Sequence, residues 1–291
     1  MSTSLAVGSL IVVAAHFGTG LRLFGGPYVV ADGRSVAVPK GTKRLLVFLA
    51  LQRRPIERCW LACLLWPEGT DSRAMGNLRS SLWRLKRADI DILETTKWTI
   101  KLRDDIATDI EVFDQWADRL IAHKPCDEDL KIPPYIMEAL DFLPGWPEDW
   151  LIMERERLRH RTLHALESLS QCLSDMGRPA EAVDAVTIAV CADPLRDTAQ
   201  RALIDAHLSE GNFIEGRRTC DAYIATMRRE LGIEPPPYLL ALRSQLHSQS
   251  AGCLNKSRSL RRVLTGNQGS SAFRSHPRFA RHVSSRVKSR C

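Results

Sequence analysis

The chain has 291 residues, of which 44% are apolar, and a formal net charge of +7. A chain of this length and composition can bury one large hydrophobic core or two ordinary ones. Its eight cysteines form no ligand pattern, because Cys59 and Cys63 have no second pair to complete a four-ligand zinc site. The cysteines therefore fit a reduced, cytoplasmic setting.

The charge is unevenly distributed along the sequence. Residues 250–291 hold ten Lys or Arg and no acidic residue. Residues 1–110 hold 16 basic and 10 acidic residues, whereas residues 111–249 hold 15 and 24. A basic amino-terminal part, an acidic middle and a basic tail suggest a module that faces nucleic acid joined to one with another task.

The first elements predicted are short strands. Residues 5–17 are apolar but too short to span a membrane, which takes about 20 residues. No basic residue precedes Arg22, so a secretory leader is the minority interpretation, and we expect an extension over residues 1–20. Between residues 21 and 39 apolar runs alternate with turn residues, which predicts strands.

Three helices and a hairpin are expected next. Apolar spacing predicts helices over residues 40–52, 56–65 and 72–87, followed by two β segments at 92–95 and 98–102. The third helix has Met75, Leu78, Leu82 and Leu85 on one stripe. We expect this stripe to be buried, and Asp71 and Ser72 to cap the helix.

The opposite face of the third helix is the candidate DNA-reading surface. Arginine can read guanine, asparagine can read adenine, and serine can reach bases or phosphates. Taken alone, the helix is better interpreted as a charged surface helix in water, and its surroundings in the sequence reverse that preference. Together with basic residues of the hairpin, the candidate DNA-binding residues are Arg73, Asn77, Ser80, Arg84, Arg87, Lys97, Lys101 and Arg103.

From residue 109 onward the pattern is helix upon helix. A long helix is predicted over residues 153–176, with Leu158, Leu163, Leu166, Leu169 and Leu173 inward. Gly177 and Gly211 stand 34 residues apart within two similar segments, and this period is the tetratricopeptide signature. The alternative is two unrelated antiparallel helix pairs. Residues 250–291 lack periodicity and are expected to be disordered.

These motifs resemble a known family. The order of strands, three helices and hairpin is similar to the winged helix-turn-helix of OmpR-type output domains. The segments LRLFGG, LLVFLALQRRPIER, LLWPE, NLRSSLWRLKR and RRELGIEPPP resemble the Streptomyces antibiotic regulatory protein (SARP) family. Residues 21–104 resemble its winged helix, and residues 109–248 resemble its bacterial transcriptional activator domain. Residues 124–134 are irregular where the family continues a helical pair.

The resemblance implies an activator that binds double-stranded DNA at repeated promoter sites and helps to recruit RNA polymerase. A homodimer is one arrangement that such repeated sites allow. The resemblance would confer the DNA-facing role on Arg73, Asn77, Ser80, Arg84 and Arg87. The ATPase that some family members carry is not expected, because no P-loop motif occurs.

The sequence as a whole predicts an α+β winged helix-turn-helix followed by an all-α tetratricopeptide-like repeat domain. We divide it into residues 1–20, 21–108, 109–249 and 250–291. No catalytic motif, cofactor site or membrane association is expected, and Glu156, His160 and His164 are taken as solvated residues rather than a metal site. Two rival functions stay open: a protein-interaction scaffold with only non-specific DNA affinity, and a sensor with a ligand in the helical groove.

Overall fold

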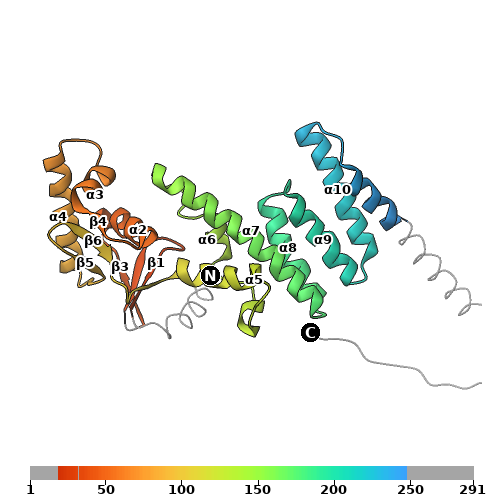
Figure 1. Cartoon of the computed structure of the whole chain (residues 1–291), viewed down its shortest axis with the longest axis horizontal. Coiled ribbons are helices and arrows are strands. Elements are labelled where there is room, and N and C mark those ends of the chain that lie inside the picture. The colour runs from red at the N-terminus through yellow and green to blue at the C-terminus, as the bar shows by residue number, and fades with distance from the viewer. Residues whose placement is uncertain (1–18, 32, 248–291) are drawn as a thin grey trace, which may run out of the picture.

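The structure of the chain is a computed structural model that describes residues 19–31 and 33–247. It is elongated, with a unit of short strands and three helices at one end and a stack of helices at the other (Figure 1). The basic tail lies outside the described residues, as does the amino-terminal extension apart from residues 19 and 20.

The first unit contains two small sheets around a bundle of three helices. One sheet has the strand order β3-β2-β1-β7, in which β7 runs parallel to β1, and the other has the order β4-β6-β5. The elements are β1 (Thr19–Arg22), β2 (Tyr28–Ala31), β3 (Arg34–Ala37), η1 (Lys40–Thr42), α2 (Lys43–Gln52), β4 (Ile56–Glu57), α3 (Arg58–Leu65), α4 (Asp71–Arg87), β5 (Leu93–Thr95), β6 (Thr99–Leu102) and β7 (Ala107–Thr108).

The second predicted helix is shorter than expected. We predicted a helix over residues 56–65, but Ile56 and Glu57 form β4, which pairs with Ile100 and Thr99 of β6. The helix proper, α3, begins at Arg58. The hairpin is thereby joined by main-chain hydrogen bonds to the residues that lead into α3.

The buried face of α4 is rotated from the one expected. Ala74, Leu78, Ser81 and Leu85 are buried, whereas Met75 and Leu82 are only half-buried. Ser81 can take a buried position because its hydroxyl donates to the carbonyl of Gly41, at 3.2 Å. The cap also differs from the prediction, since the side chain of Thr70 accepts from the backbone N–H of Arg73.

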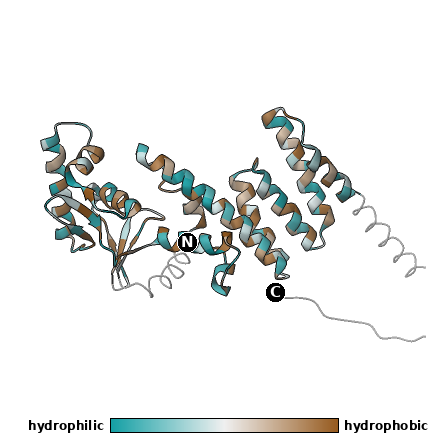
Figure 2. Cartoon of the chain, in the orientation of Figure 1, coloured by the Kyte–Doolittle hydropathy of each residue, from teal (hydrophilic) through white to brown (hydrophobic). Residues whose placement is uncertain are grey.

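The second unit consists of packed helices. The long helix expected over residues 153–176 is α7, and the five leucines expected inward are buried. Hydrophobic and hydrophilic residues alternate along these helices, as in amphipathic helices (Figure 2). The elements are α5 (Asp109–Ile121), η2 (Asp127–Leu130), α6 (Ile136–Leu140), η3 (Asp149–Leu151), α7 (Ile152–Asp175), α8 (Pro179–Ala192), α9 (Asp197–Ser209) and α10 (Phe213–Leu231). Residues 237–247 are helical too.

The 34-residue repeat seen in the sequence recurs in the backbone. Gly177 and Gly211 adopt left-handed φ angles of 73° and 77° at the turns α7–α8 and α9–α10. Their N–H groups donate to Ser174 at 3.0 Å and to Leu208 at 2.9 Å, respectively. The donors and acceptors of these two bonds are each 34 residues apart, so the two helical hairpins end and restart in the same way.

The irregular segment before α6 is held by Asp129. Burial raises the pKa of this carboxyl, but hydrogen bonds from Arg119 and Cys126 outweigh it and lower the pKa to about 2. Arg119 donates to both carboxylate oxygens at 2.7 Å. The indole of Trp116 in α5 donates to the carbonyl of Asp129, at 3.0 Å. This segment is therefore fixed to α5 although it is not a regular helix.

The two units are joined at the first residue of α5. Asp109 is buried, and its carboxylate accepts from the backbone N–H groups of Leu23 and Phe24 at 2.9 Å. Phe24 projects into the second unit, where its ring stacks on Tyr135 at 5.1 Å and meets Phe113 edge-on at 5.9 Å. One hydrophobic cluster continues from β1 into α9, so the units share a core.

In the part of the chain that the structure describes, no helix is long and apolar enough to cross a membrane.

The contact made by Asp109 can be tested by Asp109→Ala. This change leaves the N–H groups of Leu23 and Phe24 without an acceptor, and each unsatisfied buried donor costs about 1–3 kcal/mol. We expect a loss of about 2–5 kcal/mol in the free energy of unfolding, measured in urea. Asp105→Ala is the matched control, since this exposed acid pairs with Arg103 and, among the described residues, with no other cation. It should cost at most about 1 kcal/mol.

The same residue predicts a pH dependence. Burial raises the pKa of Asp109 from 3.8 to about 6, against the opposing hydrogen bonds from Phe24 and Leu23. Because the folded state then binds the proton more tightly, stability from this group is fully present below about pH 4 and falls as pH rises through about 6. The fall should be about 3 kcal/mol. Unfolding curves between pH 4 and 7 should show it in the wild type and not in Asp109→Asn; parallel curves would contradict it.

The rotation of α4 gives a third test. Leu78 is fully buried, so Leu78→Ala should cost about 2–5 kcal/mol of stability. Leu82→Ala should cost clearly less, because Leu82 is half-buried. Thermal and urea unfolding of both variants would reveal the order, and the reverse order would restore the face expected from the sequence.

Candidate nucleic-acid interface

The exposed side of α4 is rich in cations that have no acid partner. None of them takes part in an ion pair within the described residues, and all of them are exposed. The helix lies at one end of the molecule (Figure 1). The last turn carries three of them, where the helix dipole stabilises positive charge. The cations are Arg73, Arg79, Arg84, Lys86 and Arg87.

The five candidates expected on α4 lie on this side or at its edge. Arg73, Ser80, Arg84 and Arg87 are exposed, whereas Asn77 is half-buried. The guanidinium of Arg84 lies over Gly41 of η1, where a Cβ would collide with it. Gly41 thus leaves room for Arg84 at the edge of the face, next to the bond that Ser81 makes.

The three candidates of the hairpin region differ from one another. Lys97 at the tip has no acid partner within the described residues, and its ammonium lies 4.8 Å from the centre of the Trp98 ring. Lys101 is paired with Asp104 at 2.9 Å and Glu94 at 3.2 Å. The hydrogen bonds to Asp104 and Glu94 raise the pKa of Lys101. Its charge is therefore already balanced within the chain.

Arg103 is balanced in the same way. Its guanidinium pairs with Asp105 at 2.6 Å and with Asp91 at 3.1 Å. The hydrogen bond from Arg103 lowers the pKa of the Asp105 carboxyl. Of the three hairpin candidates, Lys97 is thus the one whose charge no carboxylate of the described residues balances.

Two exposed tryptophans on this surface were not singled out from the sequence. Trp83 of α4 is 59% exposed and lies under the guanidinium of Arg87, at 5.2 Å. Trp98 at the hairpin tip is 70% exposed. In the sequence, both tryptophans stand beside Lys or Arg in a basic segment, and this could have marked them as surface residues. Apolar periodicity alone would instead assign tryptophans to a hydrophobic core.

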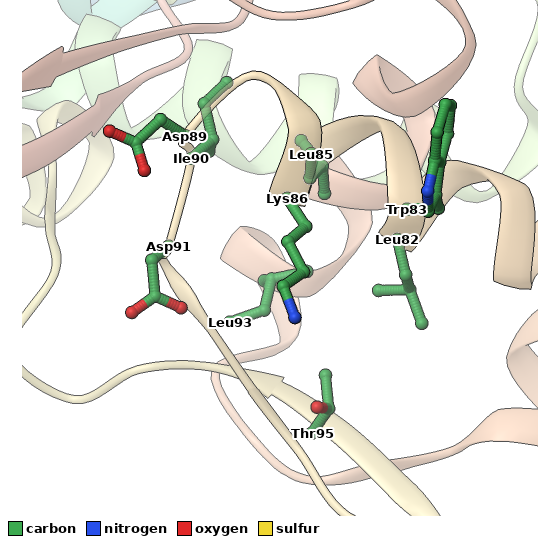
Figure 3. Close-up of a pocket in the computed structure, with 9 residues that line it drawn as sticks. All are labelled: Leu82, Trp83, Leu85, Lys86, Asp89, Ile90, Asp91, Leu93 and Thr95. Carbon is green, nitrogen blue, oxygen red and sulfur yellow. The ribbon is translucent and has the colours of Figure 1, made fainter.

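A groove of about 620 Å³ separates α4 from β5. Leu82 and Lys86 point from α4 toward Leu93 and Thr95, while Asp89 and Asp91 lie at the end where the helix leads into the strand (Figure 3). The groove is open and mixed in polarity, and it sets α4 apart from the hairpin as a separate ridge.

The described residues contain no group of three or more His, Cys, Asp or Glu arranged to hold a metal ion. His160 lies 3.8 Å from Glu156 on the exposed side of α7. His164 lies against Arg196 and Glu167, which are themselves paired at 2.5 Å. Each histidine of α7 has a charged neighbour within the protein.

Comparisons with known proteins agree with this organisation. Residues 135–247 match the family described as the bacterial transcriptional activator domain. The fold is similar to that of Mycobacterium tuberculosis EmbR in complex with a low-affinity phosphopeptide, with a TM-score of 0.63 and 19% sequence identity. That similarity covers 88% of this chain and 72% of the other. No curated protein sequence matches the chain.

The domain match agrees with the bacterial transcriptional activator domain expected from the sequence. The similarity to EmbR shows a shared fold. Residues 135–247 therefore match a bacterial transcriptional activator domain, and a unit of short strands and three helices precedes it.

Proposed function

We propose that this protein is a SARP-type transcriptional regulator, a sequence-specific activator that binds double-stranded DNA through residues 21–108. The observation that carries the proposal is the set of five exposed, unpaired cations on α4. Phosphate groups attract such a surface, and arginine can also recognise guanine in the major groove. In this proposal the first unit is a winged helix-turn-helix: α3 crosses the backbone, α4 enters the major groove, and the β5–β6 hairpin is the wing.

The roles of the candidate residues differ within this proposal. Arg73, Asn77, Ser80, Arg84 and Arg87 would face bases and phosphates from α4, and Lys97 would face a phosphate from the wing. Lys101 and Arg103 would contribute less, because carboxylates of the chain already neutralise them. Their role would be to hold the base of the wing.

The second unit would make protein contacts. Two helical hairpins with equivalent turns at Gly177 and Gly211 support a tetratricopeptide-like module, which stacks repeats into an extended surface. We propose that this module helps to recruit RNA polymerase, and that two copies of the chain bind repeated sites side by side.

DNA recognition can be tested with duplexes selected from a random pool by the full-length protein. Arg84→Ala should weaken binding to the selected duplex by about 1–3 kcal/mol, since it removes a base contact. Lys101→Ala should change affinity much less, because Lys101 is already paired. Fluorescence anisotropy measures both variants, and circular dichroism shows whether they are folded.

The competing function is that of a protein-interaction scaffold, which the repeated helical hairpins also favour. In that case the wild type would bind selected and scrambled duplexes equally, weakly, and only at low salt. Arg84→Ala and Lys101→Ala would then have equal effects. This outcome would reject sequence-specific recognition by α4.

A further inference from the structure

Two cysteines share one face of α3. Cys59 and Cys63 stand four residues apart, a spacing that places their side chains one above the other on a helix. Cys59 is exposed and Cys63 is half-buried, and their thiols lie within hydrogen-bonding reach of each other. No other two cysteines of the chain stand within one helical turn of each other in the sequence. The surface of α3 therefore presents a pair of thiols to solvent.

The pair lies close to the start of α4. The Sγ of Cys63 donates to Oδ1 of Asp71, the first residue of α4, at 3.6 Å. The two helices pack against each other at one end of the molecule (Figure 1). Cys59 stands in the first turn of α3, where the free N–H groups of a helix stabilise the negative charge of a thiolate. Two sulfur atoms and one carboxylate thus meet at this point of the surface.

The spacing of the two cysteines disfavours a disulfide between them. Residues four apart on a helix have their Cβ atoms about 5–6 Å apart, whereas a disulfide requires about 3.5–4.5 Å. A direct sulfur–sulfur bond would therefore distort α3, whose other side buries Leu61, Ala62 and Leu65 in the core. An ion placed between the two sulfur atoms bridges the longer distance and leaves the helix intact.

The ligand set selects the kind of ion. Thiolates are soft ligands that favour Cu(I), and two thiolates on opposite sides complete the coordination of this ion. Structural Zn²⁺ sites take four protein ligands, and the described residues contain no group of three or more His, Cys, Asp or Glu arranged to hold a metal ion. A pair of sulfur atoms without further ligands therefore suits Cu(I) and not Zn²⁺.

We propose that Cys59 and Cys63 form a binding site for one Cu(I) ion, held through both sulfur atoms. On binding, each thiol releases its proton to solvent and two Cu–S bonds form, with no change in the oxidation state of copper or sulfur. The hydrogen bond from Cys63 to Asp71 is lost, because the thiolate has no proton to donate. This site does not depend on the function proposed for α4.

The affinity of the site can be measured with the reduced, full-length protein under anaerobic conditions, in competition with a coloured chelator of Cu(I). Cys59→Ser and Cys63→Ser should each weaken binding about a hundredfold or more, since loss of an outer-shell group alone costs about 10–100-fold. Cys191→Ser is the matched control, because it removes an exposed cysteine of α8 that has no second cysteine within a helical turn. It should leave the affinity unchanged.

A further variant tests whether the carboxylate is a ligand. Asp71→Asn keeps the shape of the side chain and both sulfur atoms, so it should change the affinity at most about tenfold. If it costs as much as Cys63→Ser, or if Cys59→Ser binds Cu(I) as tightly as the wild type, the site with two sulfur ligands is overturned. Circular dichroism shows whether each variant is folded.

A measurement on the wild type needs no folded variant. One equivalent of Cu(I) should protect Cys59 and Cys63 together from alkylation by iodoacetamide, as read by mass spectrometry, and leave Cys191 as reactive as before. One equivalent of Zn²⁺ should protect neither cysteine of the pair. Alkylation of both at the metal-free rate, or protection of only one, would reject the proposal. Recognition of DNA by α4 stands or falls separately, because neither experiment contains DNA.

Discussion

The geometry of the molecule depends on the buried carboxylate of Asp109. This residue starts α5, and its carboxylate accepts from the two backbone N–H groups that follow β1. Two further contacts lock the same junction. Arg44 of α2 pairs with Glu148 at 2.6 Å, and Phe48 meets Trp150 edge-on at 5.1 Å. Because the units are joined at separate points and share one core, α4 holds a fixed position relative to the helical hairpins.

Much of the order of elements could be predicted from the sequence, because apolar spacing and turn residues are local signals. The length of α7, its inward leucines and the 34-residue spacing of Gly177 and Gly211 were all available in this way. The contacts that join the two units could not be predicted from the sequence. Phe24 and Asp109 are 85 residues apart in the chain, and no periodicity links a phenylalanine after a strand to an aspartate at the start of a helix.

The rotation of α4 has a similar cause. Counting apolar residues favours Met75 and Leu82 for burial, whereas the protein buries Ser81, whose hydroxyl has a carbonyl partner on η1. A hydrogen bond across 40 residues cannot be inferred from helical spacing. The pairing of Lys101 and Arg103 could have been foreseen, since Asp104 and Asp105 follow them directly and a β-hairpin brings Glu94 and Asp91 alongside.

Because the junction is fixed, the basic and acidic parts of the chain are held apart in space. Residues 1–110 carry the excess of basic residues and residues 111–249 the excess of acidic ones. The described residues of these two parts lie toward opposite ends of an elongated molecule (Figure 1). A polyanion is attracted to the first end and repelled by the second. A duplex that approaches the chain would therefore meet α4 first and leave the helical hairpins uncovered. Under the proposed function, a protein bound to the hairpins would be held at a defined place beside that duplex, because the two units share one core.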